Sequence, residues 1–340
     1  MSKQFEHLYL QLAAYYQERI AGGHYQPGEQ IDSINRIVSR HGVSRDTAKL
    51  VLQQLNREGW ATTIAGRGTF ATPQREIKKA WAVIIPLYSS NMEQLLSNLH
   101  SEALAVQRDF SYYLHYNQPE EEQRLVRQLI HEGYESIMVV PNYDETLTTG
   151  FYSRLITGRT RLILLDNTMT QSTFNCVIQS YELGIKRALE YFQQQGKSNI
   201  LLVKNEQWKG RNLLHEYIEN SLYVHATNRQ FQNISTATVM EIDAAYCREH
   251  GIDAIICNND HHAATLVGKL ASEGMVLPGE LSLINYGNTS LTRYFTPAIT
   301  AIDCKYEQLA ARAAALTVKI QKNQITEQHI IQPELIIRKT

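Results

Sequence analysis

The chain has 340 residues, of which 20% are charged, and a formal net charge of −1. This length exceeds one ordinary hydrophobic core, which predicts a small domain joined to a larger one. The sequence shows no secretory signal and no run of about 18 apolar residues, which argues against a membrane-spanning protein and predicts a cytoplasmic one with no membrane partner.

Positive charge gathers in the N-terminal part of the chain. The first 79 residues carry 11 Lys and Arg against 7 Asp and Glu, a net charge of +4, whereas the rest carries 22 against 27. A difference of this size is common on solvated surfaces, so it supports a nucleic-acid partner only together with a motif.

Such a motif lies in residues 27–71, which hold a helix, a short turn, a second helix and a hairpin in that order. The order is typical of a winged helix-turn-helix that reads duplex DNA, and we assign residues 1–71 to this DNA-binding domain. The second helix begins after a good N-cap, and an apolar stripe along it predicts packing on the helix before it. From its first turns, the side chains expected to face the major groove are Ser44, Arg45, Thr47 and Lys49. The stripe is Ala48, Val51, Leu52 and Leu55, and its expected partners are Ile34, Ile37 and Val38.

A hairpin follows, with strands predicted over residues 60–64 and 69–71. Its turn places Arg67 between Gly66 and Gly68. A bare backbone with an arginine suits close approach to a phosphate or to a narrow minor groove. A tight hairpin alone also uses two glycines, so the wing by itself fits a plain turn equally well.

These stretches resemble the gluconate-repressor (GntR) family of bacterial transcription regulators. The matching residues lie at 8–12, 27–31, 43–49 and 66–70. The resemblance implies further DNA contacts from the start of the first helix of the motif, at Ser33, Asn35 and Arg36. Asn35 stands where the family usually has an arginine that contacts DNA. Either Asn35 reads a different base, for example adenine through its amide, or Arg36 takes over.

Residues 72–79 are polar and contain a proline, which predicts a linker. Beyond them, residues 80–340 alternate short apolar runs with helical stretches, the pattern of buried parallel strands and crossover helices. About 260 residues are more than one sheet needs, so the body is predicted to be two doubly wound α/β subdomains with a cleft between them. The strands are expected at residues 81–85, 136–140, 162–165, 200–203, 254–257 and 281–284.

Polar and aromatic groups recur at the ends of these predicted strands. Carboxylates, amides and a guanidinium beside aromatic rings suit a polyhydroxylated ligand. Any single Asp or Asn at a strand end is more typical of a turn or a helix cap, but the repeated pattern favours a cleft. The expected effector contacts are Tyr88, Ser90, Asn91, Asp166, Trp208, Arg211, Asn259, Asn285 and Asn288.

The body also resembles the effector domain of the lactose and purine repressor (LacI) family, which is similar to periplasmic sugar-binding proteins. The resemblance runs from about residue 79 to residue 338, through runs such as 119–123, 277–282 and 293–300. It implies ligand contacts at Asp166, Arg211, Asn259 and the loop 88–91. Gly287 replaces an aspartate that often holds the ligand, and Asn285 or Asn288 is the candidate substitute.

A winged head on such a body is similar to chimeric arabinose-type regulators. The resemblance implies a homodimeric repressor that binds operator double-stranded DNA and responds to a monosaccharide, by analogy a pentose or a deoxyhexose. The helical stretch 92–107 is a candidate dimer seam. An activator that responds to another metabolite, such as a nucleobase, remains open, and a transport-type sugar binder is less compatible with the head.

The sequence argues against an enzyme and predicts no cofactor. It contains no dinucleotide fingerprint, no nucleophile elbow and no phosphate-binding loop. His261 and His262 are adjacent, so on a helix they would point about 100 degrees apart, and no metal partner is suitably spaced. The cysteines, Cys176, Cys247, Cys257 and Cys304, lack metal-ligand spacing and are expected to be buried and reduced.

Overall fold

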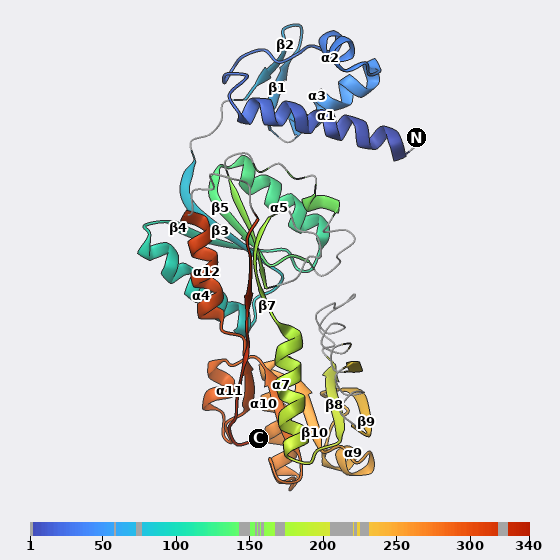
Figure 1. The fold of residues 1–340 in the computed structure, drawn as a ribbon, viewed down its shortest axis with the longest axis vertical. Coiled ribbons are helices and arrows are strands. Elements are labelled where there is room, and N and C mark those ends of the chain that lie inside the picture. The colour runs from blue at the N-terminus through green and yellow to red at the C-terminus, as the bar shows by residue number, and fades with distance from the viewer. Residues whose placement is uncertain are drawn as a thin grey trace.

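The computed structural model describes residues 3–57, 59–72, 77–142, 150–153, 155, 157, 160–166, 174–204, 220, 223–224, 231–318 and 326–340. In that part of the chain a small head precedes a body of two lobes, stacked along the long axis of the molecule (Figure 1). Each lobe is built on one six-stranded sheet.

The head consists of three helices and a two-stranded hairpin. Its elements are α1 Lys3–Ala21, α2 Ile34–His41, α3 Arg45–Arg57, β1 Ala61–Ile64 and β2 Gly68–Ala71. The core forms as the apolar spacing predicts, because the α3 stripe (Ala48, Val51, Leu52 and Leu55) is buried against Ile37 of α2 and Tyr16 of α1. The strands pair antiparallel from Ala61 opposite Ala71 to Ile64 opposite Gly68. The predicted winged helix-turn-helix is therefore confirmed.

The lobe nearer the head, here the N-lobe, has the strand order β13-β7-β6-β5-β3-β4, and all its neighbouring strands run parallel. Helices cover both faces, with α4 and α12 on one and α5 on the other. Its elements are β3 Lys78–Ile85, α4 Ser90–Ala105, β4 Asp109–Leu114, α5 Pro119–His131, β5 Tyr134–Val139, β6 Arg161–Asp166, β7 Asn175–Gln179, α12 Tyr306–Val318 and β13 Gln328–Ile331.

The C-lobe has the strand order β14-β12-β11-β10-β8-β9, with only β14 antiparallel to its neighbour. Helix α7 covers one face, and α9 and α10 cover the other. Its elements are α7 Tyr181–Gln194, β8 Asn199–Lys204, β9 Asn233–Thr238, α9 Ala244–Glu249, β10 Ala254–Cys257, α10 Asp260–Ser272, β11 Ser282–Tyr286, α11 Ser290–Tyr294, β12 Thr300–Asp303 and β14 Glu334–Ile336.

The chain passes between the lobes after β7, between β12 and α12, and between β13 and β14. These crossovers are tied together: the Ser180 N–H donates to the Ile331 carbonyl at 3.0 Å, and Lys305 forms an ion pair with Glu334 at 2.6 Å. Arg187 of α7 donates to the Pro333 carbonyl. The crossovers therefore form a hinge. Because its segments are bonded to one another, displacement of one crossover strand displaces the others.

The head meets the N-lobe at the end of α5. Gly59 has a positive φ of 75°, and any Cβ placed there would overlap the His131 ring. Lys78, at the start of β3, pairs with Glu132 at 3.3 Å. Residues 73–76 of the expected linker lie outside the described residues, and β3 already begins at Lys78. The division at residues 72–79 stays a prediction.

Candidate DNA-binding face and effector cleft

The start of α3 presents two basic side chains on an exposed face. Arg45 and Lys49, four residues apart, are both exposed, on the side opposite the buried stripe. Ser44 caps the helix, since its Oγ accepts from the Thr47 N–H at 3.1 Å. Thr47 itself is only 5% exposed, and its hydroxyl lies 2.9 Å from Ser44 Oγ. Its burial fits a role in holding Ser44 better than the expected direct contact with a base.

The start of α2 is arranged in a similar way. Ser33 caps the helix by accepting from the Arg36 N–H, and both Asn35 and Arg36 are exposed. Just before the cap, buried Asp32 accepts from the Tyr16 hydroxyl at 2.8 Å and from Arg40. Asp32 thus joins α1 to α2. Since both Asn35 and Arg36 are exposed, both alternatives for the missing family arginine remain.

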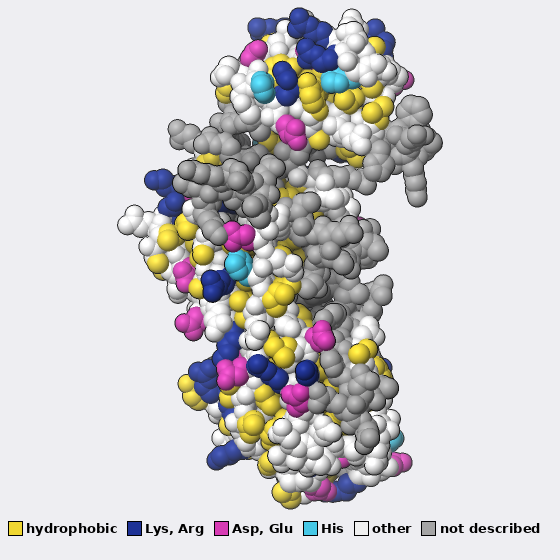
Figure 2. Space-filling view, viewed as in Figure 1, with side chains coloured by type: hydrophobic (Ala, Val, Ile, Leu, Met, Phe, Trp, Pro, Cys, Tyr) yellow, Lys and Arg dark blue, Asp and Glu magenta, His cyan; other side chains and the backbone are white. Residues whose placement is uncertain are grey.

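The wing turn keeps Arg67 exposed between two glycines with positive φ values. Gly66 has open space around it, whereas a Cβ at Gly68 would overlap the Gln30 side chain. Gln30 Nε2 also donates to the Arg67 carbonyl at 3.2 Å. The packing of Gln30 against the turn therefore explains why residue 68 is a glycine. The open space around Gly66 suits close approach to DNA. Figure 2 shows Lys and Arg side chains gathered on the head at the end away from the body.

Asp166 ends β6 at the edge of the N-lobe sheet that faces the C-lobe. It adopts a left-handed backbone with φ 65° and is only 2% exposed. Burial raises the pKa of Asp166 to about 6, and a hydrogen bond from Tyr181 opposes that rise. Its Oδ1 has no hydrogen-bond partner among the described residues. A buried carboxylate oxygen of this kind fits a ligand that donates hydrogen bonds.

Tyr181 extends this site into the C-lobe. Its ring stacks on Tyr286, at the end of β11, with centroids 5.4 Å apart and planes at 27°. Gln179, at the end of β7, is 2% exposed and lies near the Cys304 thiol just beyond β12, and neither of its side-chain amide atoms has a hydrogen-bond partner among the described residues. Burial raises the pKa of that thiol, and the nearby Asp166 charge adds to the effect. Gln179, Tyr181 and Cys304 were missed in the sequence, although all three stand at or shortly after strand ends. Tyr286 lies in the expected strand-end run 285–288, although it was not named as an effector contact.

The residues of the loop after β3 lie in two different environments, one exposed at the edge of the N-lobe and one buried against the C-lobe. Tyr88 is 55% exposed, and its ring lies 6.4 Å from Tyr112 of the edge strand β4. Ser90 is half-buried at the start of α4. Asn91 turns toward the C-lobe, where its side-chain amide lies over Gly287 with Oδ1 buried and without a hydrogen-bond partner in the described part of the chain.

The asparagines of the C-lobe have structural partners. Asn259 caps α10, its Oδ1 accepting from the N–H groups of His261 and His262. Asn285 is fully buried and donates to Asp260 Oδ1 at 2.6 Å, and Asn288 Oδ1 accepts from Arg338. Asn285 Oδ1 is buried without a hydrogen-bond partner among the described residues, so Asn285 stays a candidate substitute for the aspartate replaced by Gly287, whereas Asn288 Oδ1 is engaged by Arg338. Trp208 and Arg211 lie outside the described residues.

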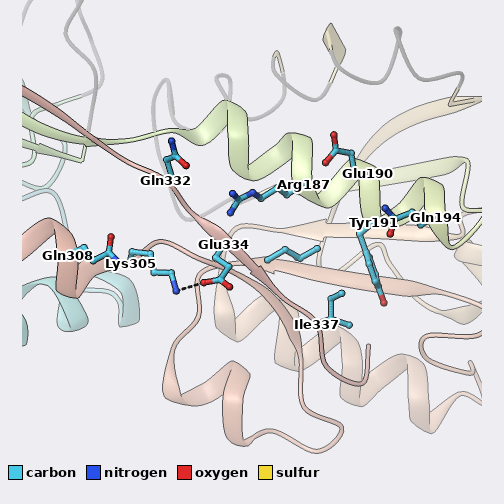
Figure 3. A pocket seen from close by; sticks show the side chains of 10 residues that line it. Arg187, Glu190, Tyr191, Gln194, Lys305, Gln308, Gln332, Glu334 and Ile337 are labelled. Carbon is cyan, nitrogen blue, oxygen red and sulfur yellow. Dashed lines mark ion pairs between the residues drawn. The ribbon is translucent and has the colours of Figure 1, made fainter.

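A separate hollow of about 570 Å³ lies at the hinge, between α7, the start of α12 and the chain that leads through β14 (Figure 3). Its charged side chains include Arg187 and Glu190 of α7 and the Lys305–Glu334 ion pair. None of the expected effector residues in the described part of the chain lines it, so it is distinct from the candidate effector site around Asp166.

Comparison with known proteins identifies both parts of the chain. Residues 8–71 match the model of bacterial regulatory proteins of the gntR family, and residues 189–340 match that of a periplasmic binding protein-like domain. The arabinose metabolism transcriptional repressor of Geobacillus stearothermophilus is 21% identical, over 97% of this chain and 96% of its own length. This protein is a GntR-type transcriptional repressor with a LacI-like effector domain.

Other regulators match a part of this chain. The HTH-type transcriptional repressor PurR of Vibrio campbellii is 29% identical, over 30% of this chain and 31% of its own length. The dimeric Lac repressor with an 11-residue C-terminal deletion has the same body fold, with a TM-score of 0.66 at 16% identity, over 76% of this chain and 98% of that one. A periplasmic binding protein/LacI regulator of Alkaliphilus metalliredigens, solved with D-xylulofuranose, has a TM-score of 0.62 at 18% identity, over 77% of this chain and 99% of that one.

The repressor is therefore a DNA-binding regulator with a small-molecule effector domain, and not an enzyme. Within the described ranges, no group of three or more His, Cys, Asp or Glu side chains could hold a metal ion. All four cysteines are free and buried, as expected. None of the described helices is long and apolar enough to cross a membrane.

Proposed function

We propose that the repressor is a cytoplasmic, sugar-responsive homodimer that binds a two-fold symmetric operator and changes its operator affinity when a monosaccharide fills the cleft. The arabinose repressor in the comparison and the neighbour solved with a ketopentose favour a pentose, with a deoxyhexose as the next choice. The observation that carries the proposal is the contact chain from Asp166 through Tyr181 to Tyr286, because it places a hydrogen-bond acceptor and stacked rings between the two lobes.

The DNA contacts follow from the exposed residues of the head. Arg45 at the start of α3 is the candidate for a bidentate contact with guanine, and Lys49 one turn later for a phosphate contact. Asn35 and Arg36 at the start of α2 and Arg67 in the wing complete the face. Ser33, Ser44 and Thr47 act mainly through the caps that hold the two helix starts.

The dimer is proposed because one operator half-site gives a single head few contacts, whereas a two-fold dimer places one recognition helix in each half-site. The edge of the N-lobe offers a surface for it. Leu104 of α4 and Tyr112 of β4 are 62% and 50% exposed. Tyr88, whose ring lies 6.4 Å from that of Tyr112, and Tyr116, shortly after β4, are exposed as well. Aromatic and apolar groups of this kind are enriched where subunits meet.

A nucleobase is the second candidate effector. The partial match to purine repressors and the stacked pair Tyr181 and Tyr286 favour it, since a flat base can lie against an aromatic ring. The two candidates differ in the groups that would donate hydrogen bonds to the Asp166 carboxylate. A sugar donates from paired hydroxyls, and a base donates from ring and exocyclic N–H groups.

The test is a thermal-shift screen of the full chain with L-arabinose, D-xylulose, L-fucose, hypoxanthine and guanine. A ligand present at 100 times its dissociation constant stabilises the folded protein by about 2.7 kcal/mol, which is easily detected. Stabilisation by a sugar that Asp166→Asn abolishes supports the proposal. Stabilisation by a base alone favours the second candidate, and a response to none of them contradicts both.

A further inference from the structure

Two amide side chains on the first turns of α4 reach from the N-lobe to the C-lobe. Gln94 Nε2 donates to the backbone carbonyl of Asn288 at 2.9 Å. One turn earlier, the Asn91 amide lies over the backbone of Gly287. Both contacts fall on the short loop between β11 and α11, so α4 of the N-lobe contacts the C-lobe at this loop.

Gly287 has no room for a side chain. A Cβ placed on it would lie 2.6 Å from Asn91 Oδ1 and 2.8 Å from Asn91 Nδ2, well inside van der Waals contact. Its φ of 132° is also unfavourable for any L residue. A side chain here would therefore displace the whole Asn91 amide or push the two lobes apart.

Both sides of this contact are held firmly. In the N-lobe, Ser89 caps α4 by accepting from the Met92 N–H at 3.3 Å, and Met92 is buried in the core. In the C-lobe, Arg338 donates to Asn288 Oδ1 and, through Nη1, to the Ile299 carbonyl at 2.6 Å. Since neither partner can adjust freely, the contact itself sets how closely the lobes approach.

We infer that Asn91 and Gln94 form a closure latch on Gly287 and Asn288, and that Asn91 takes the place in the effector site that a C-lobe side chain at position 287 would otherwise fill. The specificity part of this inference rests on the proposed function, and the latch does not. Asn91 Oδ1 is buried and lacks a partner among the described residues, so it accepts a hydrogen bond from an effector hydroxyl. An amide carries no charge, which favours a neutral polyol over a ligand with an ammonium group.

The latch is tested without any ligand. Cysteines introduced at the exposed positions Ser101 and Ser272, one in each lobe, carry spin labels, since the native thiols are buried. The distance between the labels is measured in the otherwise unchanged chain, in Gly287→Ala and in Gln94→Ala. Gly274→Ala is the matched control, because Gly274 also has a positive φ of 83° but has open space around it.

We expect a longer distance in Gly287→Ala, a broader distribution in Gln94→Ala, and no change in Gly274→Ala. The latch is wrong if Gly287→Ala keeps the short distance, if Gly274→Ala lengthens it equally, or if the unchanged chain is already as open as Gly287→Ala.

The role of Asn91 in specificity is tested by titrating L-arabinose and D-xylulose into the unchanged chain, Asn91→Ala and Asn91→Asp. Losing a hydrogen bond to a buried polar group should weaken binding of the responsive sugar at least tenfold in Asn91→Ala. Equal binding by Asn91→Ala overturns the role of Asn91 and leaves the proposed function standing. Absence of binding by every variant, the unchanged chain included, contradicts both the proposed function and the role of Asn91, while the distance measurement still decides the latch.

Discussion

At the scale of single residues, His115 and Glu122 form a buried titratable pair between the end of β4 and the start of α5. His115 follows β4, is fully buried and bonds through Nε2 to the Val140 carbonyl at 3.1 Å. Glu122, in the first turn of α5, accepts from the Tyr152 hydroxyl at 2.8 Å and from the Asn142 N–H. Burial raises the pKa of Glu122 to about 7 and lowers the pKa of His115 to about 4, in each case disfavouring the charged form.

The two shifts act on stability in opposite directions. Between about pH 4.5 and 7 the folded protein holds a proton on Glu122 that the unfolded chain has lost, so acidification stabilises the fold. Between about pH 6.5 and 4 the unfolded chain protonates His115 and the folded one does not, so acidification destabilises it. Over the shared window the two contributions largely cancel.

Glu122→Gln should remove the stabilising contribution of Glu122 on acidification and leave the destabilising contribution of His115. As the pH falls from 6.5 to 4.5, its free energy of unfolding should decrease by about 2 to 3 kcal/mol more than that of the unchanged chain. Urea unfolding at a series of pH values measures this, with Glu120→Gln, an exposed neighbour, as the control. Parallel pH profiles of Glu122→Gln and the unchanged chain would show that the pair does not titrate as described.

Arg45 and Lys49 should separate base reading from phosphate binding. Arg45→Ala should weaken operator binding by roughly 1 to 3 kcal/mol and leave binding to unrelated DNA less affected, because a base contact is sequence-specific. Lys49→Ala should weaken both and flatten the salt dependence. Fluorescence anisotropy at two salt concentrations measures these effects, with Arg57→Ala at the far end of α3 as the control. An equal loss on both DNAs for Arg45→Ala would place Arg45 on a phosphate instead.

How far single residues could be predicted depends on what surrounds them. Asp166 was found because a carboxylate directly after an apolar strand is conspicuous in the sequence. Asn259 has the same appearance, yet it caps α10, since the sequence does not show which way a strand-end amide turns. Tyr286 lies in a strand-end run whose asparagines were named as the contacts, and Cys304 was expected only to be buried and reduced. In the fold, Tyr286 stacks on Tyr181, and Cys304 lies close to Asp166.

At the scale of elements, the buried strands with longer apolar runs were predictable, whereas the edge strands and the short buried strands β7 and β12 were not. All six predicted strands correspond to β3, β5, β6, β8, β10 and β11, because strands covered on both faces are continuous apolar runs. The missed strands include β4 and β9 at the sheet edges, which are partly exposed and rich in polar residues. Strands β13 and β14 are short and far along the chain from the strands they pair with, so pattern alone does not indicate their place.

The cap of α3 offers a test at this scale. Ser44→Ala removes the acceptor for the Thr47 N–H and leaves the buried Thr47 hydroxyl without that neighbour, which should cost about 1 kcal/mol of stability. Because the first turn of α3 carries Arg45, operator affinity should fall as well. Thermal unfolding and anisotropy measure the two effects. The control is Ser39→Ala, whose exposed hydroxyl donates within α2 and caps no helix start. Full operator affinity in Ser44→Ala would mean that DNA itself orders the turn.

At the scale of the whole molecule, contacts join the two lobes to each other and the N-lobe to the head. The lobes are held by the crossover hinge at one side and by the contacts of α4 at Gly287 and Asn288 on another. The N-lobe meets the head where the His131 ring of α5 lies against Gly59. A change in the angle between lobes therefore reorients the lobe that carries the head, and in a dimer the spacing of two heads follows that of the two N-lobes.

This coupling makes a quantitative prediction, because free energies around a binding cycle must close. If the responsive sugar weakens operator binding by a certain factor, operator DNA must weaken sugar binding by an equal factor, with a coupling free energy of roughly 1 to 3 kcal/mol. Operator affinity is measured with and without saturating sugar, and sugar affinity with and without saturating operator DNA. Gly287→Ala, in which we expect the lobes not to close, should reduce both factors toward one together, whereas Gly274→Ala should leave both unchanged. If Gly287→Ala binds the sugar fully and still releases the operator, the signal to the head does not pass through closure of the lobes.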